Sequence, residues 1–141
     1  STLLASSAAS DVYKRQIMEN FVIEKVVTED MLAVNVGSGS LRVLATPTVV
    51  ALMEEASTKL ADTFLDEGLT TVGTMVEIQH ISPSPIGAKI KVESKLISND
   101  GRSFKFEVTA YDNAGMIANG THNRVSVKSE KFQKKADEKF E

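Results

Sequence analysis

The longest helical pattern in the chain is Thr46-Pro-Thr-Val-Val-Ala-Leu-Met-Glu-Glu-Ala-Ser-Thr-Lys-Leu-Ala-Asp-Thr-Phe64. Apolar side chains recur along it at the spacing of one helix face, at Val49, Leu52, Met53, Ala56, Leu60 and Phe64. Thr46 is a residue type that caps helix N-termini, Pro47 suits the first helical position, and Gly68 follows the last apolar residue. The sequence therefore predicts one long amphipathic helix, capped by Thr46, that runs toward Gly68.

Strand patterns flank this helix on both sides. Before it, residues 21–27 and 31–36 are predicted to be short strands, followed by the flexible connector Gly37-Ser-Gly-Ser40. After it, the period changes to alternation over residues 71–81, 88–98, 103–111 and 116–127. The turn sequences Asn99-Asp-Gly101 and Asp112-Asn-Ala-Gly115 join neighbouring segments, so we expect an antiparallel meander. The charged tail over residues 130–141 is expected to be helical.

One long helix between two sets of strands predicts an α+β architecture. A curved antiparallel β-sheet would wrap the central helix, which is the outline of a hotdog fold. A single helix covers only part of one sheet face, and such a sheet has free edges. We therefore expect at least a homodimer that pairs or covers an edge.

Composition excludes several classes of function. The chain has 141 residues, of which 42% are hydrophobic and 25% charged, and this suits one domain. It has no cysteine, which excludes disulfides, thiolate metal sites and cysteine nucleophiles, and we expect no metal site. A net charge of -3 argues against nucleic-acid binding. There is no apolar run long enough to span a membrane and no export signal, so we expect a cytoplasmic protein.

The first residues are treated apart from the fold. The hexapeptide Asp11-Val-Tyr-Lys-Arg-Gln16 resembles translated sequencing-adapter sequence, and the residues before it lack the charged start of a signal peptide. We interpret residues 1–17 as an adapter-derived extension. The native start is then Met18, and residues 18–141 form a single domain.

Several short motifs occur in a fixed order along the chain. Ala45-Thr46 opens the helix, Glu54 follows, Gly73 lies in the next strand, and His80 stands seven residues beyond it. Three further motifs follow them, which are Pro85-Ile-Gly87, Gly101-Arg-Ser-Phe104 and Gly120-Thr-His-Asn-Arg124. Together they resemble the fluoroacetyl-CoA thioesterase-like branch of the hotdog superfamily, and the resemblance covers roughly residues 21–132.

The resemblance implies hydrolysis of an acyl-CoA thioester without a cofactor, since coenzyme A is part of the substrate. Thr46, Glu54 and His80 match the catalytic threonine, glutamate and histidine of the family. Gly73 matches a backbone position near the thioester, and Arg124 matches an arginine near the substrate. Members specific for the fluoroacetyl group carry bulky aromatic residues before the threonine, where this chain has Gly37-Ser-Gly-Ser-Leu41. We therefore expect a small acyl group and do not infer selectivity for fluoroacetyl.

Thioester hydrolysis needs an activated water or a nucleophile, and donors for the oxyanion. Glu54 suits either the general base or the nucleophile, and His80 suits orienting the carboxylate, binding the acyl group or carrying a proton to the thiolate. Thr46 suits positioning or attack. We prefer Glu54 as base or nucleophile, His80 as proton shuttle and Thr46 as positioning hydroxyl. Pro47 and Glu54 are separated by about 10 Å of helix rise, so we expect a site at the dimer interface that draws on both subunits.

Each of these residues also has a structural interpretation. Glu54 beside Glu55 fits a solvated pair, Thr46 fits an N-cap, and His80 fits a satisfied core histidine. Gly73 fits a strand irregularity or a point of close approach, and Arg124 fits a partner of either a coenzyme A phosphate or a surface acid. His122 fits a supporting or purely structural residue and is left out of the catalytic set.

Two other functions compete with hydrolysis. A hotdog hydratase would need an Asp-His pair on the helix, and Pro47-Thr-Val-Val-Ala-Leu-Met53 contains neither residue. A non-catalytic hotdog protein that binds acyl-CoA or another small ligand would need the same pocket without the chemistry of Glu54.

Overall fold

The computed structural model describes residues 19–141, so the expected extension over residues 1–17 and the expected start at Met18 lie outside the described residues. The elements follow one another as β1 (Asn20–Val26), η1 (Glu29–Met31), α2 (Ala33–Val36), α3 (Thr46–Asp62), β2 (Leu69–His80), β3 (Lys89–Asn99), β4 (Ser103–Asp112), β5 (Gly115–Lys128) and α4 (Ser129–Asp137). The five strands form one antiparallel sheet in the order β1-β3-β4-β5-β2. The predicted α+β class is confirmed.

The meander is confirmed for three of the four strands that follow the helix. β3, β4 and β5 are consecutive neighbours, whereas β2 pairs with β5 and occupies one edge of the sheet. Asp100 closes the β3–β4 turn, because its Oδ1 accepts hydrogen bonds from the backbone N–H groups of Arg102 and Ser103. β1 forms the other edge, so β1 and β2 each have one side without a neighbouring strand among the described residues.

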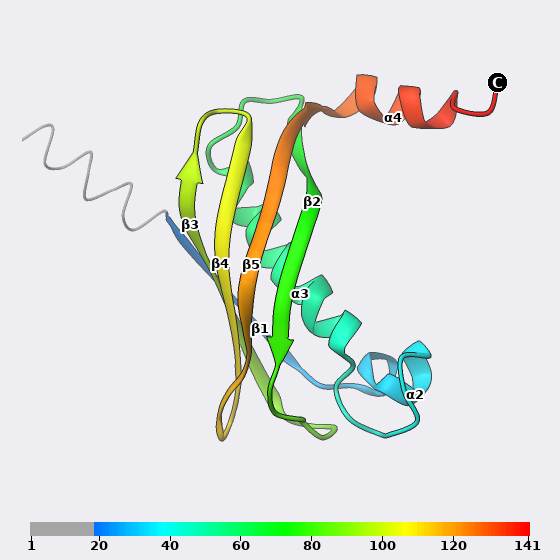
Figure 1. Ribbon diagram of the computed structural model, residues 1–141, viewed down its shortest axis with the longest axis vertical. Helices are drawn as coiled ribbons and strands as arrows, with labels where there is room; N and C mark the ends of the chain where they lie inside the picture. Colours follow the sequence, from blue (N-terminus) through cyan, green and yellow to red (C-terminus); the bar gives the residue numbers. More distant parts are fainter. Residues whose placement is uncertain (1–18) are drawn as a thin grey trace, which may run out of the picture.

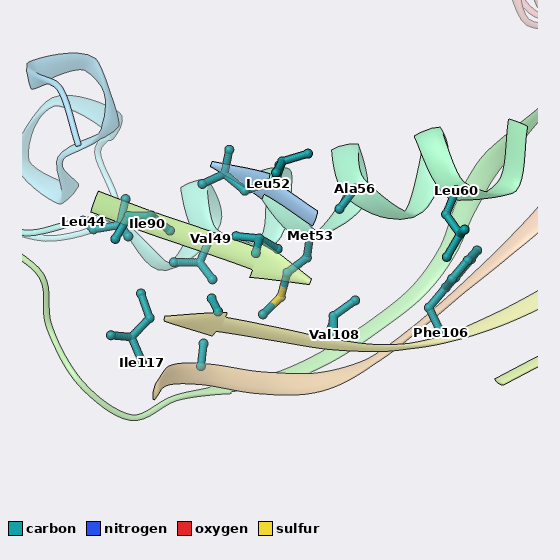
Figure 2. Packing of buried hydrophobic residues seen from close by; sticks show 14 of the residues in the cluster. Leu44, Val49, Leu52, Met53, Ala56, Leu60, Ile90, Phe106, Val108 and Ile117 are labelled. Carbon is teal, nitrogen blue, oxygen red and sulfur yellow. The ribbon is translucent and has the colours of Figure 1, made fainter. Parts of the chain in front are cut away.

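Helix α3 packs against one face of the sheet (Figure 1). Its apolar side chains meet those of the sheet and of the adjoining segments in a single core (Figure 2). The largest fully buried side chains of this core include Met53 and Leu60 from the helix and Phe104 and Phe106 from β4. Burial of each such side chain contributes roughly 1.5–3 kcal/mol, so this interface is the main source of the fold's stability.

The predicted ends of the helix are wrong on both sides. The N-cap residue is Ala45, with extended backbone, and Thr46 is the first helical residue. At the other end the helix finishes at Asp62, and residues 63–65 continue only as single hydrogen-bonded turns. Gly68, at a φ of 87°, then redirects the chain into β2.

The predicted strand over residues 31–36 is also wrong. The segment forms the end of η1 and the short helix α2. Its backbone bonds are satisfied locally, because the Val36 and Gly37 N–H groups donate to the carbonyls of Leu32 and Ala33. Gly37 stops the turn in the left-handed region, at a φ of 88°. Leu32 and Ala33 are buried in this compact turn, whereas Val34 and Val36 are 42% and 44% exposed, so the apolar alternation does not mark one buried strand face.

The β2 strand contains an irregularity that matters for the site. The register of the β2–β5 pair shifts between Gly73 and Met75, where one residue on β2 has no counterpart on β5. Such a bulge reverses the alternation of side chains beyond it. Thr71 and Gly73 therefore face the helix before the bulge, and Ile78 and His80 face it afterwards.

The C-terminal helix α4 leaves the body at the end of β5 (Figure 1). None of its residues is buried. Its existence confirms the expectation of a helical tail. Within residues 19–141, none of the helices has the length and hydropathy needed to cross a membrane. The expectations about nucleic acid, membranes and cellular location stay predictions.

Candidate active site

Thr46 and His80 meet at the N-terminal end of α3. The Thr46 hydroxyl Oγ1 lies 2.8 Å from His80 Nδ1, in hydrogen-bonding contact. Because Ala45 holds the N-cap position, the threonine hydroxyl is not engaged in capping the helix. The other ring nitrogen of His80, Nε2, is buried and has no hydrogen-bond partner in the part of the chain that the structure describes. This histidine is thus held at one ring nitrogen, and its second ring nitrogen has no partner among the described residues.

A hollow of about 280 Å³ adjoins this pair. Thr46 and His80 line it together with Ser38, Leu44 and Ile81, among others. We call it the Thr46 hollow. It combines an apolar wall with a hydroxyl and an imidazole, which is the make-up of a small-molecule site.

Glu54 lies in the middle of α3, two turns beyond Thr46. Its side chain is 44% exposed, and Oε2 lies 3.4 Å from Nη1 of Arg124 on β5. Gly73 on β2 is the third member of this contact: a Cβ atom at that position would stand 2.9 Å from Glu54 Oε2. The predicted close approach at Gly73 is therefore present, and the atom that approaches is the carboxylate oxygen.

Arg124 is almost completely buried, with 6% of its surface exposed. Its Nε donates to Thr71 Oγ1 at 2.7 Å, and its Nη2 donates to the Thr71 carbonyl at 2.9 Å. Desolvation by burial lowers the pKa of Arg124, and the charge of Glu54 raises it. Of the two partners considered from the sequence, the acid is present, and it is Glu54 from the site itself. The guanidinium is thus held rigidly beside the carboxylate.

His122 is the residue that the sequence interpretation left out. It is 1% exposed, and its Nδ1 lies 2.8 Å from the Met75 carbonyl, next to the β2 bulge. A carbonyl only accepts, so Nδ1 carries the proton; Nε2 then accepts from Arg124 Nη1 at 3.1 Å. Burial is the main cause that lowers the pKa of His122 below its ordinary value. His122 is therefore a neutral histidine with a fixed tautomer, and it holds Arg124 in place by accepting a hydrogen bond from its guanidinium.

One signal in the sequence was available for this residue. His122 and Arg124 are two positions apart on a strand, and therefore share a face. Once Arg124 is assigned to the site, its neighbour on that face belongs to the same cluster.

The five predicted site residues thus fall into two groups within one chain. Thr46 and His80 form one group, and Glu54, Gly73 and Arg124 form the other, with His122 added. Eight residues of helix separate Thr46 from Glu54, about 12 Å, and seven residues of strand separate Gly73 from His80, about 23 Å. The chain by itself does not bring Glu54 to His80. Over the described residues there is also no cluster of three or more His, Asp or Glu side chains suited to a metal ion.

Comparison with known proteins identifies the family. The model of the family described as fluoroacetyl-CoA-specific thioesterase matches residues 27–130 of the chain. The chain belongs to this family. A fluoroacetyl-CoA thioesterase of Streptantibioticus cattleyicolor is 34% identical over 97 residues, which are 69% of this chain and 70% of that protein. The expectation of a thioester hydrolase is confirmed at the level of this family.

Solved structures agree with the family assignment. A structure of the fluoroacetyl-CoA thioesterase superposes with a TM-score of 0.81 at 29% identity, covering 87% of this chain and 96% of that one. A thioesterase superfamily member from Thermus thermophilus superposes at 0.74 and 29% identity, covering 81% and 85%. A hot-dog-like protein from Thermanaerovibrio acidaminovorans, at 0.78 and 21% identity over 86% and 90%, supports the fold alone. The predicted hotdog fold is confirmed.

Proposed function

We propose that this family member is an acyl-CoA thioesterase that hydrolyses a small acyl thioester with Glu54, His80 and Thr46. The observation that carries the proposal is the hydrogen bond between Thr46 Oγ1 and His80 Nδ1 at the edge of the Thr46 hollow. It joins two residues that are 34 positions apart and that match catalytic residues of the family. A purely structural histidine would have both ring nitrogens satisfied, whereas Nε2 of His80 has no partner among the described residues.

The chemistry follows from the two groups of residues. Glu54 takes a proton from water as the water oxygen attacks the carbonyl carbon, or attacks that carbon itself and forms an anhydride that water then opens. The C–S bond breaks, the sulfur receives a proton from His80 and leaves as the thiol of coenzyme A, and the acyl group leaves as a carboxylic acid. The proton released by the water then returns to His80, which restores both residues. Free N–H groups at the start of α3 suit the oxyanion, although Pro47 removes one of them.

Arg124 and His122 act as positioning residues in this scheme. Arg124 touches Glu54 rather than solvent, and four contacts through Thr71, His122 and Glu54 fix its guanidinium plane. A carboxylate anchored on one oxygen keeps the other free to receive a proton or to attack. The substrate contact that the resemblance implies for Arg124 stays a separate prediction.

A small acyl group suits the Thr46 hollow. Its volume of about 280 Å³ lies just below the range of roughly 300–1,000 Å³ that is usual for ligand pockets, so it suits only a small group. Ser38, from the loop with Gly37 and Gly39, lines it. The loop carries no aromatic side chain that would close over the acyl group.

A homodimer completes the site in this proposal. The outer edge of β2 has no neighbouring strand among the described residues, and Met75 and Val76 on it are 38% and 40% exposed. An unpaired edge of this length is a template for pairing. Antiparallel pairing of β2 with the same strand of a second copy would bring the Thr46–His80 pair of one subunit to Glu54 of the other. Each of the two sites would then draw on both chains.

A thiol-release assay tests the proposal. Acetyl-, butyryl-, aromatic and fluoroacetyl-CoA are offered to the native protein and to the variants Glu54→Gln and Glu55→Gln. Glu55 is the matched control, because it is the next residue on the same helix and pairs with Lys25 and Lys59. Glu54→Gln should lose at least about a hundredfold in kcat/KM, and Glu55→Gln should stay close to native.

The competing functions predict other results. Full activity of Glu54→Gln would overturn the assignment of Glu54. Binding of acyl-CoA without release of thiol from any member of the panel would favour the non-catalytic binding protein. Selective turnover of fluoroacetyl-CoA would contradict the inference of a general small-acyl site.

A further inference from the structure

A second hollow lies at the end of the sheet where β5 leads into α4. Its volume is about 470 Å³, and its lining includes four cationic side chains, which are Arg102, Lys128, Lys131 and Lys135, and the aromatic ring of Phe132. We call it the basic hollow. No acidic residue lines it, although the chain as a whole has a net charge of -3. Glu67 and Glu130 line an adjoining hollow that shares Lys128 and Lys131 with this one, so the acidic side chains stand beside the cations and not among them.

The four cations are not used to hold the fold together. None of them takes part in an ion pair within residues 19–141, whereas the neighbouring Lys134, which does not line this hollow, pairs with Glu138. All four lie in exposed positions. Lys131 and Lys135 are one helical turn apart, so α4 presents both on the same side. Arg102 reaches the hollow from the β3–β4 turn.

Phe132 adds a different kind of contact. It is 47% exposed, which is unusual for a phenylalanine on a short helix that buries nothing. An exposed aromatic ring offers a stacking surface for a nucleobase, and lysine and arginine side chains form charge-assisted hydrogen bonds with phosphate. An aromatic ring among four unpaired cations is thus complementary to a phosphorylated nucleoside.

We infer that the basic hollow binds the phosphorylated adenosine end of coenzyme A, an inference that rests on the proposed thioesterase function. The hollow and Glu54 are connected by β2. Leu69 lines the hollow, and Gly73, four residues further on and about 13 Å away along the strand, touches the Glu54 site. The extended pantetheine arm of coenzyme A is long enough to cover this separation.

In the proposed dimer, the basic hollow, Glu54 and the Thr46 hollow can be reached by one bound acyl-CoA molecule. Within one chain the Thr46 hollow and the basic hollow lie at opposite ends, since α2 and α4 are at opposite ends of the molecule (Figure 1). Antiparallel pairing along β2 reverses one subunit against the other. The basic hollow of one subunit then lies at the same end as the Thr46–His80 pair of its partner, with Glu54 between them. One acyl-CoA would lie along this line, with its nucleotide on one chain and its acyl group on the other.

A substrate comparison tests the inference. The double variant Lys131→Glu/Lys135→Glu is assayed with acetyl-CoA and with S-acetyl-N-acetylcysteamine, which carries the same thioester without the nucleotide. The matched control is Lys89→Glu/Lys91→Glu, an equal charge change on exposed positions of β3. The α4 variant should raise KM for acetyl-CoA about tenfold, with kcat unchanged. Its kinetics with the truncated thioester should match native protein, and the control variant should do so with both substrates.

Other results would overturn the inference. An unchanged KM for acetyl-CoA in the α4 variant, or an equal rise in the β3 control, would show that the basic hollow does not bind the nucleotide. If neither thioester is hydrolysed by the native protein, the proposed function fails separately, and direct titration with adenosine 3′,5′-bisphosphate decides about the hollow. Binding that is weakened by salt and by the α4 substitutions supports it; no binding of this probe, or equal binding of unphosphorylated adenosine, refutes it.

Discussion

Gly73 and Glu54 are so close that no side chain fits between them. A Cβ atom at position 73 would lie 2.9 Å from Glu54 Oε2, 3.2 Å from His122 Cε1 and 3.3 Å from Arg124 Nη1. Because Gly73 has no side chain, the Glu54 carboxylate can lie against β2 beside Arg124.

The substitution Gly73→Ala should displace the Glu54 carboxylate by several tenths of an ångström. We expect kcat/KM to fall about tenfold or more, because a small misplacement of a reacting group carries a large kinetic cost. The effect should be absent when Glu54 is already glutamine, so a double-mutant cycle of the two positions measures the coupling. Additive losses in that cycle would contradict the contact.

The Thr46 hydroxyl should matter through His80 and not through the helix cap. Thr46→Ser keeps a hydroxyl that can reach Nδ1 and should retain most activity. Thr46→Val has the shape of threonine without the hydroxyl and should lose about ten- to a hundredfold in kcat. The measurement is thiol release at saturating substrate, with thermal unfolding as a check on folding. Equal activity of the serine and valine variants would remove the hydroxyl from the mechanism.

Mixed dimers should show which catalytic residues of one site come from the same subunit and which come from its partner. Glu54→Gln and His80→Ala chains, each inactive alone, should recover roughly a quarter of native activity when mixed equally, because each heterodimer contains one intact site. Thr46→Ala mixed with His80→Ala should recover nothing, since both chains then lack the bonded pair. Recovery in the second mixture, or none in the first, would contradict the shared site.

Folding stability should depend on pH through His122. Burial lowers the pKa of His122 from the ordinary value of 6.5, so the unfolded state binds a proton in a pH range where the folded state does not. The contribution of His122 to stability is thus complete above pH 6.5 and is lost as the pH falls toward its lowered pKa. The variant His122→Gln should show a smaller decrease in its free energy of unfolding between pH 7 and 5 than native protein, measured by urea titration. Parallel pH profiles would disprove the assignment.

Gly120 should be required for the β2–β5 pair itself. A Cβ there would overlap the Glu77 carbonyl oxygen and lie 2.7 Å from Ile78 Cα, and neither backbone atom can turn aside. We expect Gly120→Ala to lower the free energy of unfolding by more than about 2 kcal/mol. Equilibrium denaturation measures this, and a loss below half that value would show that the two strands part readily.

The sequence predicted the elements that depend on periodicity. The segment from Thr46 has a helical period, and the later segments alternate, so α3 and four long strands were foreseeable. It predicted less about ends and turns. The N-cap is Ala45, and the Thr46 hydroxyl bonds His80, a contact between segments that no local rule contains.

The individual site residues could be predicted from the sequence, but their division into two separate groups could not. Thr46, Glu54 and His80 came from a resemblance, and the division of these residues into two groups needs the register of α3 on β2. His122 was missed because its value lies in its hydrogen bonds to Met75 and Arg124. A strand irregularity at Gly73 was one of the structural interpretations and is confirmed, but only the pairing with β5 shows where the extra residue stands.

That extra residue decides which side of the sheet the later residues of β2 face. Gly73 and His80 are an odd number of positions apart, so in a regular strand they would point to opposite sides. The bulge between Gly73 and Met75 adds one residue that has no partner on β5. Gly73 and His80 therefore both face the helix. If the same residues formed a regular strand without the bulge, composition would be unchanged, yet His80 would turn away from the helix. Among relatives, the histidine therefore marks an intact site only where the spacing and the bulge agree, as they do here with an odd spacing and one unpaired residue.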